Sequence, residues 1–218
     1  TSDMHWTKCL LELLFPPRCV ACDAPAPGPE GFCAPCAVSL TPLHDSAADS
    51  SSQGLRILAP HAYGAALADA IIRLKHAGRP EIARVLVRGL TVRWPAPLSA
   101  GVALVPVPLH PRDLRSRGYN QAALLADHLA RSWALPVHDI LLRTQRSGGQ
   151  RGRDPSSRRE AVAGAFTLAR STRRGLKGRS VILVDDVVTT GATARAAAGA
   201  LRAGGIPVAC VVAIARSL

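Results

Sequence analysis

Two adjacent acids, Asp185 and Asp186, precede a short turn rich in threonine and glycine, residues 189–193. Carboxylates only accept hydrogen bonds, so an acid pair suits a partner that donates two, such as the vicinal hydroxyls of a ribose. Threonine hydroxyls and free N–H groups at a helix start can hold a phosphate, and Gly191 lets the backbone approach the anion. The stretch therefore predicts a site for a phosphorylated sugar, unless the aspartates only cap the following helix.

The flanking residues predict the elements that position this site. Residues 181–184 are apolar and predict a buried parallel strand, and the alanine-rich residues 194–205 predict a helix that ends at glycine. Ligands bind outside the carboxyl ends of strands in open α/β sheets, which is where the turn would lie. Neighbouring side chains of a strand point to opposite faces, so we expect the pleat to break after Val184 and both acids to turn toward one ligand.

Four cysteines stand as two Cys-x-x-Cys pairs, Cys19 with Cys22 and Cys33 with Cys36. Each pair can present two thiolates to one ion, and two pairs complete the tetrahedron of a structural Zn²⁺ site. Disulfide bonds and a redox pair are the alternatives. A cytoplasmic setting disfavours the first, and two pairs at ribbon spacing disfavour the second. A closed site has no open position, so we expect this zinc to stabilise and not to catalyse.

A basic segment, residues 110–121, follows an apolar strand that ends in two prolines. It places Arg112, Arg115 and Arg117 beside a turn at Gly118, just before a helix that begins near Tyr119. Such a segment would suit a pyrophosphate, although a solvated basic loop before a helix would look the same.

Two further basic features complete the pattern. Lys75 and His76 end a predicted helix, where a positive charge also interacts favourably with the helix dipole. Residues 143–166 contain six arginines and little apolar periodicity. A polar loop of this length in a compact domain is either disordered or functional, and a mobile lid over a phosphate-rich substrate is the functional reading.

The whole chain has 218 residues and a formal net charge of +12. This charge suits a polyanionic substrate or nucleic acid, and the alternative explanation is a coding bias toward arginine. Its few aromatic residues, 4% of the total, count against dedicated single-strand recognition. We find no apolar run of membrane-spanning length, so we expect a cytoplasmic protein with no membrane partner. The cysteines outside the ribbon are Cys9 and Cys210, and we expect Cys210 to be buried.

Four regions follow from these patterns: an N-terminal helix at 1–18, a zinc ribbon at 19–40, a linker at 41–55 and an α/β domain at 56–218. Within the last region, helices are predicted at residues 65–78, 80–94 and 119–133. Strands are predicted at residues 56–63, 101–109, 137–142, 165–168, 181–186 and 208–215. Strands that alternate with helices predict a parallel sheet with helices on both faces.

These features together resemble the ComF family, a branch of the type I phosphoribosyltransferases. The motifs that carry the resemblance are the ribbon cysteines, Lys75-His76-x-Gly78, Pro106-Val107-Pro108, residues 117–121, Gln150, Arg158, residues 164–166 and residues 185–193. Family members have an N-terminal four-cysteine ribbon and a phosphoribosyltransferase-like domain, and they are linked to the import of single-stranded DNA in natural competence. One departure affects the lid segment, where Ala161 stands in place of the usual Asn and Ser147 in place of Thr.

The resemblance implies a Rossmann-like phosphoribosyltransferase fold and a Mg²⁺-dependent transfer of ribose 5-phosphate from phosphoribosyl pyrophosphate to an acceptor that the sequence does not specify. The implied catalytic residues are Asp185, Asp186 and Arg158. The implied donor-binding residues are Val187, Val188, Thr189, Thr190, Gly191, Ala192, Thr193, Arg112, Arg117, Lys75 and Gln150. Single-stranded DNA and proteins of the competence machinery are the implied further partners. A non-enzymatic DNA-handling or regulatory protein that keeps the donor site is the alternative.

Overall fold

The structure is a computed structural model that describes residues 17–25, 31–43, 54–94, 101–144, 164–169, 176 and 178–217. The helix predicted within 1–18 and most of the predicted lid, 145–163, lie outside these residues, as do residues 44–53 of the predicted linker.

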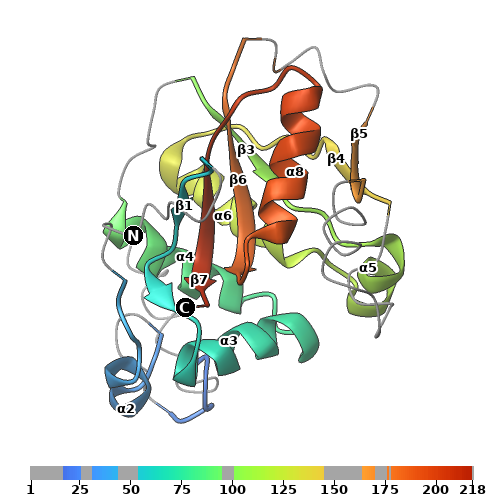
Figure 1. Cartoon of the computed structure of the whole chain (residues 1–218). Helices are drawn as coiled ribbons and strands as arrows, with labels where there is room; N and C mark the ends of the chain where they lie inside the picture. Colours follow the sequence, from blue (N-terminus) through green and yellow to red (C-terminus); the bar gives the residue numbers. More distant parts are fainter. Residues whose placement is uncertain are drawn as a thin grey trace, which may run out of the picture.

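A parallel sheet forms the centre of the described chain (Figure 1). The strands of this sheet are β1 (Ile57–Leu58), β2 (His61–Ala62), β3 (Ala103–Pro106), β6 (Val181–Val188) and β7 (Val208–Arg216). Their order is β1-β7-β6-β3, with β2 also paired to β7, and all these pairings are parallel. The predicted strand at 56–63 is divided into β1 and β2 around Pro60, whose ring nitrogen has no hydrogen to donate to a ladder.

Helices cover both faces of this sheet, as predicted (Figure 1). The helices packed against one face are α3 (Ala65–His76), α4 (Ile82–Arg93) and α6 (Gln121–Trp133), and α8 (Ala192–Ala203) covers the other. Strand β6 shows why: Ile182 and Val184 belong to the core with the first group, whereas Val181 and Leu183 pack on the side of α8. The continuous apolar run of this strand therefore serves two cores at once, as is typical of parallel sheets.

The strands predicted at 137–142 and 165–168 do not extend the central sheet in the way the prediction assumed. Strands β4 (Leu141–Arg143) and β5 (Phe166–Leu168) form a separate antiparallel pair, and Val137 alone bridges to Leu104 of β3. The side chains of Leu141 and Phe166 are buried in the same core as α8. The pair therefore covers the second face of the sheet and does not widen the sheet.

Two short helices complete the described fold, α2 (Ala34–Val38) in the ribbon and α5 (Pro111–Arg117) after β3. No helix was predicted over the residues of α5. It begins at Pro111, a favourable first helical residue, and the His110 side chain accepts a hydrogen bond from the Arg112 amide. It ends at Gly118 in the left-handed conformation, with φ 83°. Cys210 is buried in β7, as predicted.

Candidate active site and metal centre

Strand β6 runs through the acid pair, so the prediction that the pleat breaks after Val184 is wrong. Asp185 pairs in register with Ala213 and Val188 pairs with Arg216. Strand β7, the next strand along the chain, continues alongside β6 with an apolar stretch that keeps the ladder intact. Because successive side chains of a strand alternate, Asp185 and Asp186 project toward opposite faces of the sheet.

The two carboxylates accordingly have different partners. Lys75, in the last turn of α3, places its Nζ 3.0 Å from Oδ2 of Asp186. Asp185 interacts electrostatically with Arg143 at the end of β4, and Asp113 of α5 also acts on Arg143. The guanidinium carbon of Arg143 lies 5.2 Å from the ring centre of Phe166, which fixes it over an aromatic face.

Burial and, second, the negative charge of Asp186 raise the pKa of Asp185 to about 7. The amide of Asp186, which donates to Oδ1 of Asp185 at 2.9 Å, and the positive charges of Lys75 and Arg143 act in the opposite direction. One member of the pair is thus held as an ion pair with Lys75, while the other is poised to exchange a proton near neutral pH.

The threonine turn lies at the start of α8, where it was predicted. Gly191 is the residue before this helix and has φ 72°, a left-handed conformation that side chains rarely adopt. Thr189 and Thr190 are exposed, and the Thr190 hydroxyl accepts a hydrogen bond from the Ala192 amide at 3.4 Å. The exposed hydroxyls and the helix N-terminus form a cradle suited to a phosphate.

Arg195, one turn into α8, bends back over this turn. Its Nη1 lies 2.9 Å from the point that a Cβ at position 191 would occupy. Sequence reasoning missed Arg195, although its position four residues after the turn glycine places it on the same helix face. A glycine at 191 therefore leaves room for a guanidinium beside the cradle.

The segment that joins α5 to α6 lies against the end of α3. The Tyr119 hydroxyl donates to the carbonyl oxygen of Leu74 at 2.5 Å. The Asn120 side chain caps α6 by accepting from the Ala122 amide, and it donates to the Val107 carbonyl oxygen at 3.1 Å. Arg117 donates to Oε1 of the buried Gln121 at 3.1 Å. These bonds tie the basic segment to the carboxyl end of β3, which neighbours β6.

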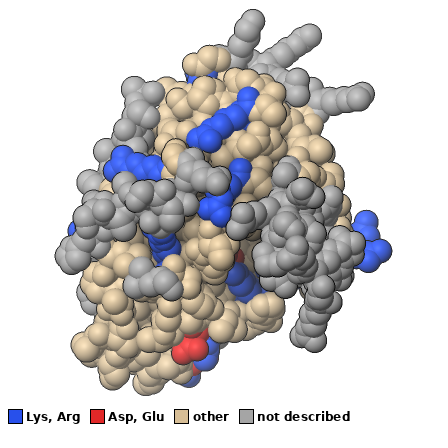
Figure 2. Space-filling view, in the orientation of Figure 1, with Lys and Arg blue, Asp and Glu red and all other residues tan. Residues whose placement is uncertain are grey.

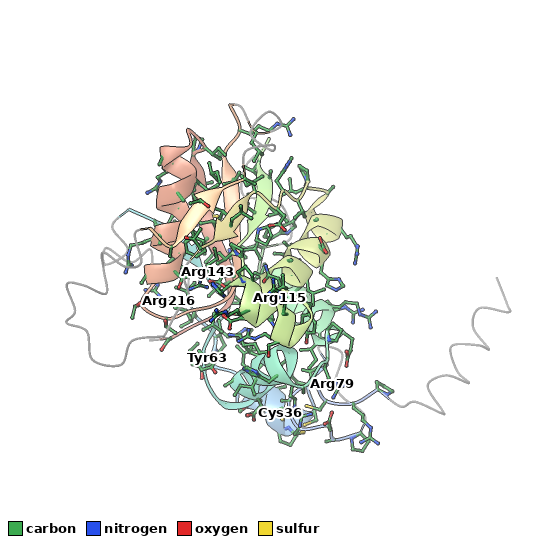
Figure 3. All side chains as sticks on the ribbon, turned by 90° about the vertical axis from the view of Figure 1, so that its right-hand side faces the viewer. Cys36, Tyr63, Arg79, Arg115, Arg143 and Arg216 are labelled. Atoms are coloured by element: carbon green, nitrogen blue, oxygen red, sulfur yellow. The ribbon has the colours of Figure 1, made fainter. Side chains whose placement is uncertain are left out.

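The structure thus gathers Lys75, Asp185 and Asp186 into one electrostatic cluster and adds Arg143, which the sequence indicated only as the first residue of the predicted lid. Figure 3 shows Arg143 and Arg115 on the side of the molecule turned toward the viewer, above Arg79 and Cys36. Exposed Arg112 and half-buried Arg117 lie on α5. The predicted site residues Gln150 and Arg158 lie outside the described residues.

The four ribbon cysteines converge on one point. The Sγ atoms of Cys19, Cys22, Cys33 and Cys36 all lie within 4.8 Å of one another, and those of Cys22 and Cys33 are 3.6 Å apart. A tetrahedron with Zn–S bonds of about 2.3 Å has edges of about 3.8 Å. Four sulfur ligands at this spacing fit a structural Zn²⁺.

The electrostatics of the cluster also favour a cation. Burial raises the pKa of Cys19, but hydrogen bonds from the backbone of Cys33, Cys22 and Ala21 outweigh burial and lower it to about 6. The pKa of Cys36 is raised, first by burial and then by the neighbouring thiols. One thiolate therefore forms readily, and further thiolates need a positive ion between them.

Comparisons with known proteins identify two domain families in the chain. The Double zinc ribbon domain family matches residues 10–54, and the Phosphoribosyl transferase domain family matches residues 117–217. The chain is 30% identical over 185 residues to the DNA utilization protein YhgH of Escherichia coli O157:H7, a match that covers 80% of this chain and 79% of that protein.

Two shorter matches concern competence proteins. Competence protein F of Haemophilus influenzae is 42% identical over 92 residues, covering 42% of this chain and 40% of that protein. Competence protein ComFC of Bacillus subtilis is 35% identical over 98 residues, covering 45% of this chain and 37% of that protein.

The fold and the two sites define a phosphoribosyltransferase-type α/β protein joined to a four-cysteine zinc ribbon. The chain belongs to the ComF family, as the resemblance predicted. Among the described residues, no helix combines the length and the apolar character needed to cross a bilayer.

Proposed function

We propose that the chain binds phosphoribosyl pyrophosphate with Mg²⁺ at the carboxyl edge of its sheet and transfers ribose 5-phosphate to an acceptor. The observation that carries this proposal is the sequence of groups at the end of β6: the two carboxylates, then the exposed threonines, then the left-handed Gly191 at the start of α8. The names of the relatives support a role in DNA utilization and competence, which we propose for this chain as well.

Each group has a task in this reaction. The threonine turn and the α8 N-terminus would hold the 5′-phosphate, and Asp185, on the face of the sheet that α8 covers, would accept from the ribose hydroxyls. Asp186, on the opposite face, would act through its ion pair with Lys75. Arg117 would hold the pyrophosphate, whose charge grows as the C1–O bond breaks. Carboxylate oxygens fit Mg²⁺, which, when bound with the donor, supplies charge neutralisation for the leaving group.

We expect phosphoribosyl pyrophosphate with Mg²⁺ to raise the melting temperature. A ligand at one hundred times its Kd stabilises the native state by about 2.7 kcal/mol, which is about 5–10 °C for a chain of this length. The Thr189→Val/Thr190→Val variant removes two hydroxyls that would bond the phosphate and should lose tenfold or more in affinity, at about 1.5 kcal/mol for each such bond. Differential scanning fluorimetry, with and without added Mg²⁺, measures both effects.

The matched control is Thr167→Val, which removes an exposed threonine hydroxyl from β5. It should shift with the donor as the wild type does. Equal shifts in wild type and the double valine variant would place the ligand elsewhere, and no shift in the wild type would contradict the proposed function.

A second candidate function, binding of single-stranded DNA, is favoured by the charge of the protein. The net charge is +12, and on the face shown in Figure 2 basic side chains are spread over the described surface with few acidic ones between them. Residues 143–179 contain eleven Lys or Arg against two acids. The phosphate backbone of DNA binds such a surface whatever the base sequence, and the affinity falls steeply as the salt concentration rises.

We expect DNA and phosphoribosyl pyrophosphate to compete in part, because the phosphates of both would seek the same arginines. A labelled oligonucleotide is titrated at low salt with and without saturating donor. Replacing Arg151, Arg153 and Arg158 with alanine should weaken both ligands. These three residues lie outside the described part of the structure.

The control removes the same number of charges from the exposed flank of α4 and α6, with Arg84, Arg88 and Arg131 replaced by alanine. It should lower DNA affinity less and leave donor binding unchanged. If the affinity for DNA is the same with and without saturating donor, the two ligands do not share a site. If no DNA binds at low salt, the DNA-handling function itself fails.

A further inference from the structure

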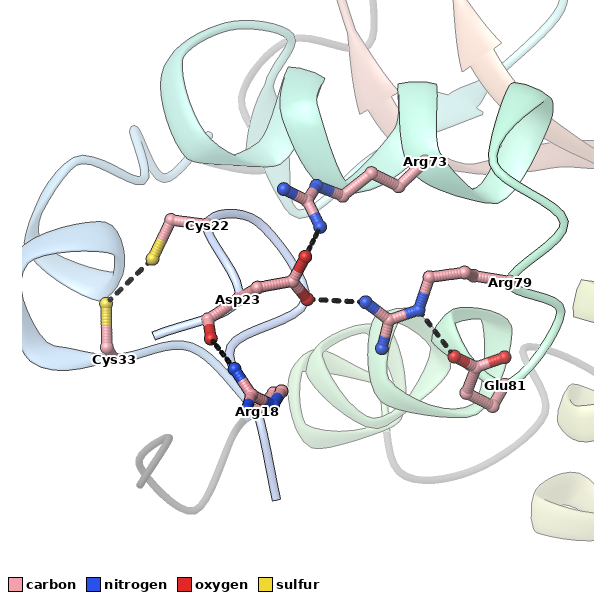
Figure 4. A network of polar contacts seen from close by, with 7 residues as sticks. All are labelled: Arg18, Cys22, Asp23, Cys33, Arg73, Arg79 and Glu81. Atoms are coloured by element: carbon pink, nitrogen blue, oxygen red, sulfur yellow. Dashed lines mark hydrogen bonds and ion pairs between the residues drawn. The ribbon is translucent and has the colours of Figure 1, made fainter. Parts of the chain in front are cut away.

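The zinc ribbon is joined to the α/β domain through one carboxylate. Asp23 follows directly after Cys22, and its Oδ2 forms an ion pair with Nη1 of Arg73 on α3 (Figure 4). Its Oδ1 lies 2.5 Å from Nη1 of Arg79, in the loop after α3. A single ribbon side chain thus holds both the last turn of α3 and the loop that follows.

Apolar packing joins the same two parts. Val20 and Phe32 of the ribbon are buried in one continuous core with residues of α3, α4 and α6. The backbone of Gly31 presses on α4 so closely that a Cβ there would lie 2.4 Å from Cγ1 of Val85. The ribbon therefore shares a core with the α/β domain and is not an independent module.

The last turn of α3 is held at three successive residues. Arg73 binds the ribbon through Asp23, the Leu74 carbonyl accepts from Tyr119, and Lys75 pairs with Asp186 of the candidate active site. Arg73 and Lys75 belong to one helical turn, so a shift of the backbone at Arg73 also moves the backbone at Lys75.

The zinc knuckle in turn fixes Asp23. The Asp23 amide donates to the Cys19 carbonyl oxygen at 3.0 Å, and the Cys19 amide donates to the Ala24 carbonyl oxygen at 2.9 Å. Asp23 itself has φ 61°, a left-handed conformation that Asp and Asn tolerate better than most residues. Cys19 and Cys22 lie within this turn, and a Zn²⁺ ion bound by both would keep its shape.

We propose that Asp23 is a positioning residue that sets Lys75 against Asp186, so that the zinc-loaded ribbon orders the donor site. The inference rests on the proposed function only for the identity of the ligand that Lys75 and Asp186 serve. Coupling of this kind is reciprocal, so donor binding should also raise the affinity for zinc, measured by competition with a chelator at equilibrium.

The test uses the full chain with Asp23→Asn, which keeps the left-handed turn but removes the charge. Zinc content should stay at the wild-type value. The rate at which a lysine-acylating reagent labels Lys75, followed by peptide mass spectrometry, should rise about fivefold or more, and donor affinity should fall by a similar factor. Because ion pairs with this exposure contribute little to global stability, the melting temperature without donor should barely change.

The matched control is Glu81→Gln. Glu81 accepts from the other side of Arg79 at 2.7 Å and does not contact Asp23. Its replacement should leave both the labelling of Lys75 and donor affinity at wild-type values.

Two outcomes separate this inference from the proposed function. If Lys75 is labelled at the wild-type rate in Asp23→Asn, the positioning role is wrong, whether or not the affinity for the donor changes. If the wild type binds no donor but Lys75 labelling rises in Asp23→Asn, the proposed function fails and the positioning of Lys75 stands. Equal effects of Asp23→Asn and Glu81→Gln would also overturn the inference.

Discussion

We expect the Cys33→Ser variant to lose its zinc and to lower the free energy of unfolding of the whole protein by at least about 3 kcal/mol. Cys33 is buried and belongs to the core that α3, α4 and α6 share with the ribbon. Without the metal, Val20 and Phe32 have no ordered ribbon to hold them in that core. The loss should therefore reach the α/β domain. Elemental analysis and urea denaturation measure the two effects.

The control for this variant is Cys210→Ala. Cys210 lies in β7, away from the ribbon cluster, and its replacement should keep the zinc at about one ion per chain. Full zinc occupancy in Cys33→Ser, or a wild-type protein that contains no zinc and a disulfide between Cys19 and Cys22, would contradict the structural role.

Asp185→Asn should stabilise the protein at pH 8, whereas Asp186→Asn should not. The folded state raises the pKa of Asp185 to about 7 through burial and the charge of Asp186. The folded chain thus binds a proton more tightly than the unfolded chain, whose carboxyl has a pKa of about 3.9. The contribution of Asp185 to stability is therefore greatest below pH 4 and is lost as the pH rises toward 7.

Asp185→Asn removes the titrating group. Its free energy of unfolding should therefore equal that of the wild type at pH 4 and exceed it by on the order of 2 kcal/mol at pH 8. Asp186→Asn leaves Lys75, only 24% exposed, without its partner, which offsets any relief of repulsion. Urea denaturation at pH 4, 6 and 8 distinguishes the two variants.

Both variants should nevertheless weaken donor binding, because Asp185→Asn replaces an acceptor for the ribose hydroxyls by an NH₂ donor and Asp186→Asn releases Lys75 from its ion pair. The control Asp69→Asn neutralises an exposed carboxylate on α3 and should change neither the pH profile nor the donor-induced shift. Superimposable pH profiles for the wild type and Asp185→Asn would show that Asp185 ionises normally.

The sequence by itself determined the groups that carry the chemistry. The cysteine pairs and residues 185–193 are contiguous motifs, so the ligands of one ion and the cradle of one phosphate can be predicted from spacing alone. The central sheet and its helices were predictable for a similar reason, since strands buried on both faces leave continuous apolar runs and helices leave periodic ones.

Only the tertiary structure decided how far β6 runs, and so which face each aspartate takes. The extension of β6 past Val184 depends on pairing with β7, and the contacts of Lys75 with Asp186 and of Asp23 with Arg73 join residues distant in the chain. Such contacts leave no periodic signature in the sequence. They arise when parts of the chain that are far apart pack on the same core, and here that packing also joins the ribbon to the site.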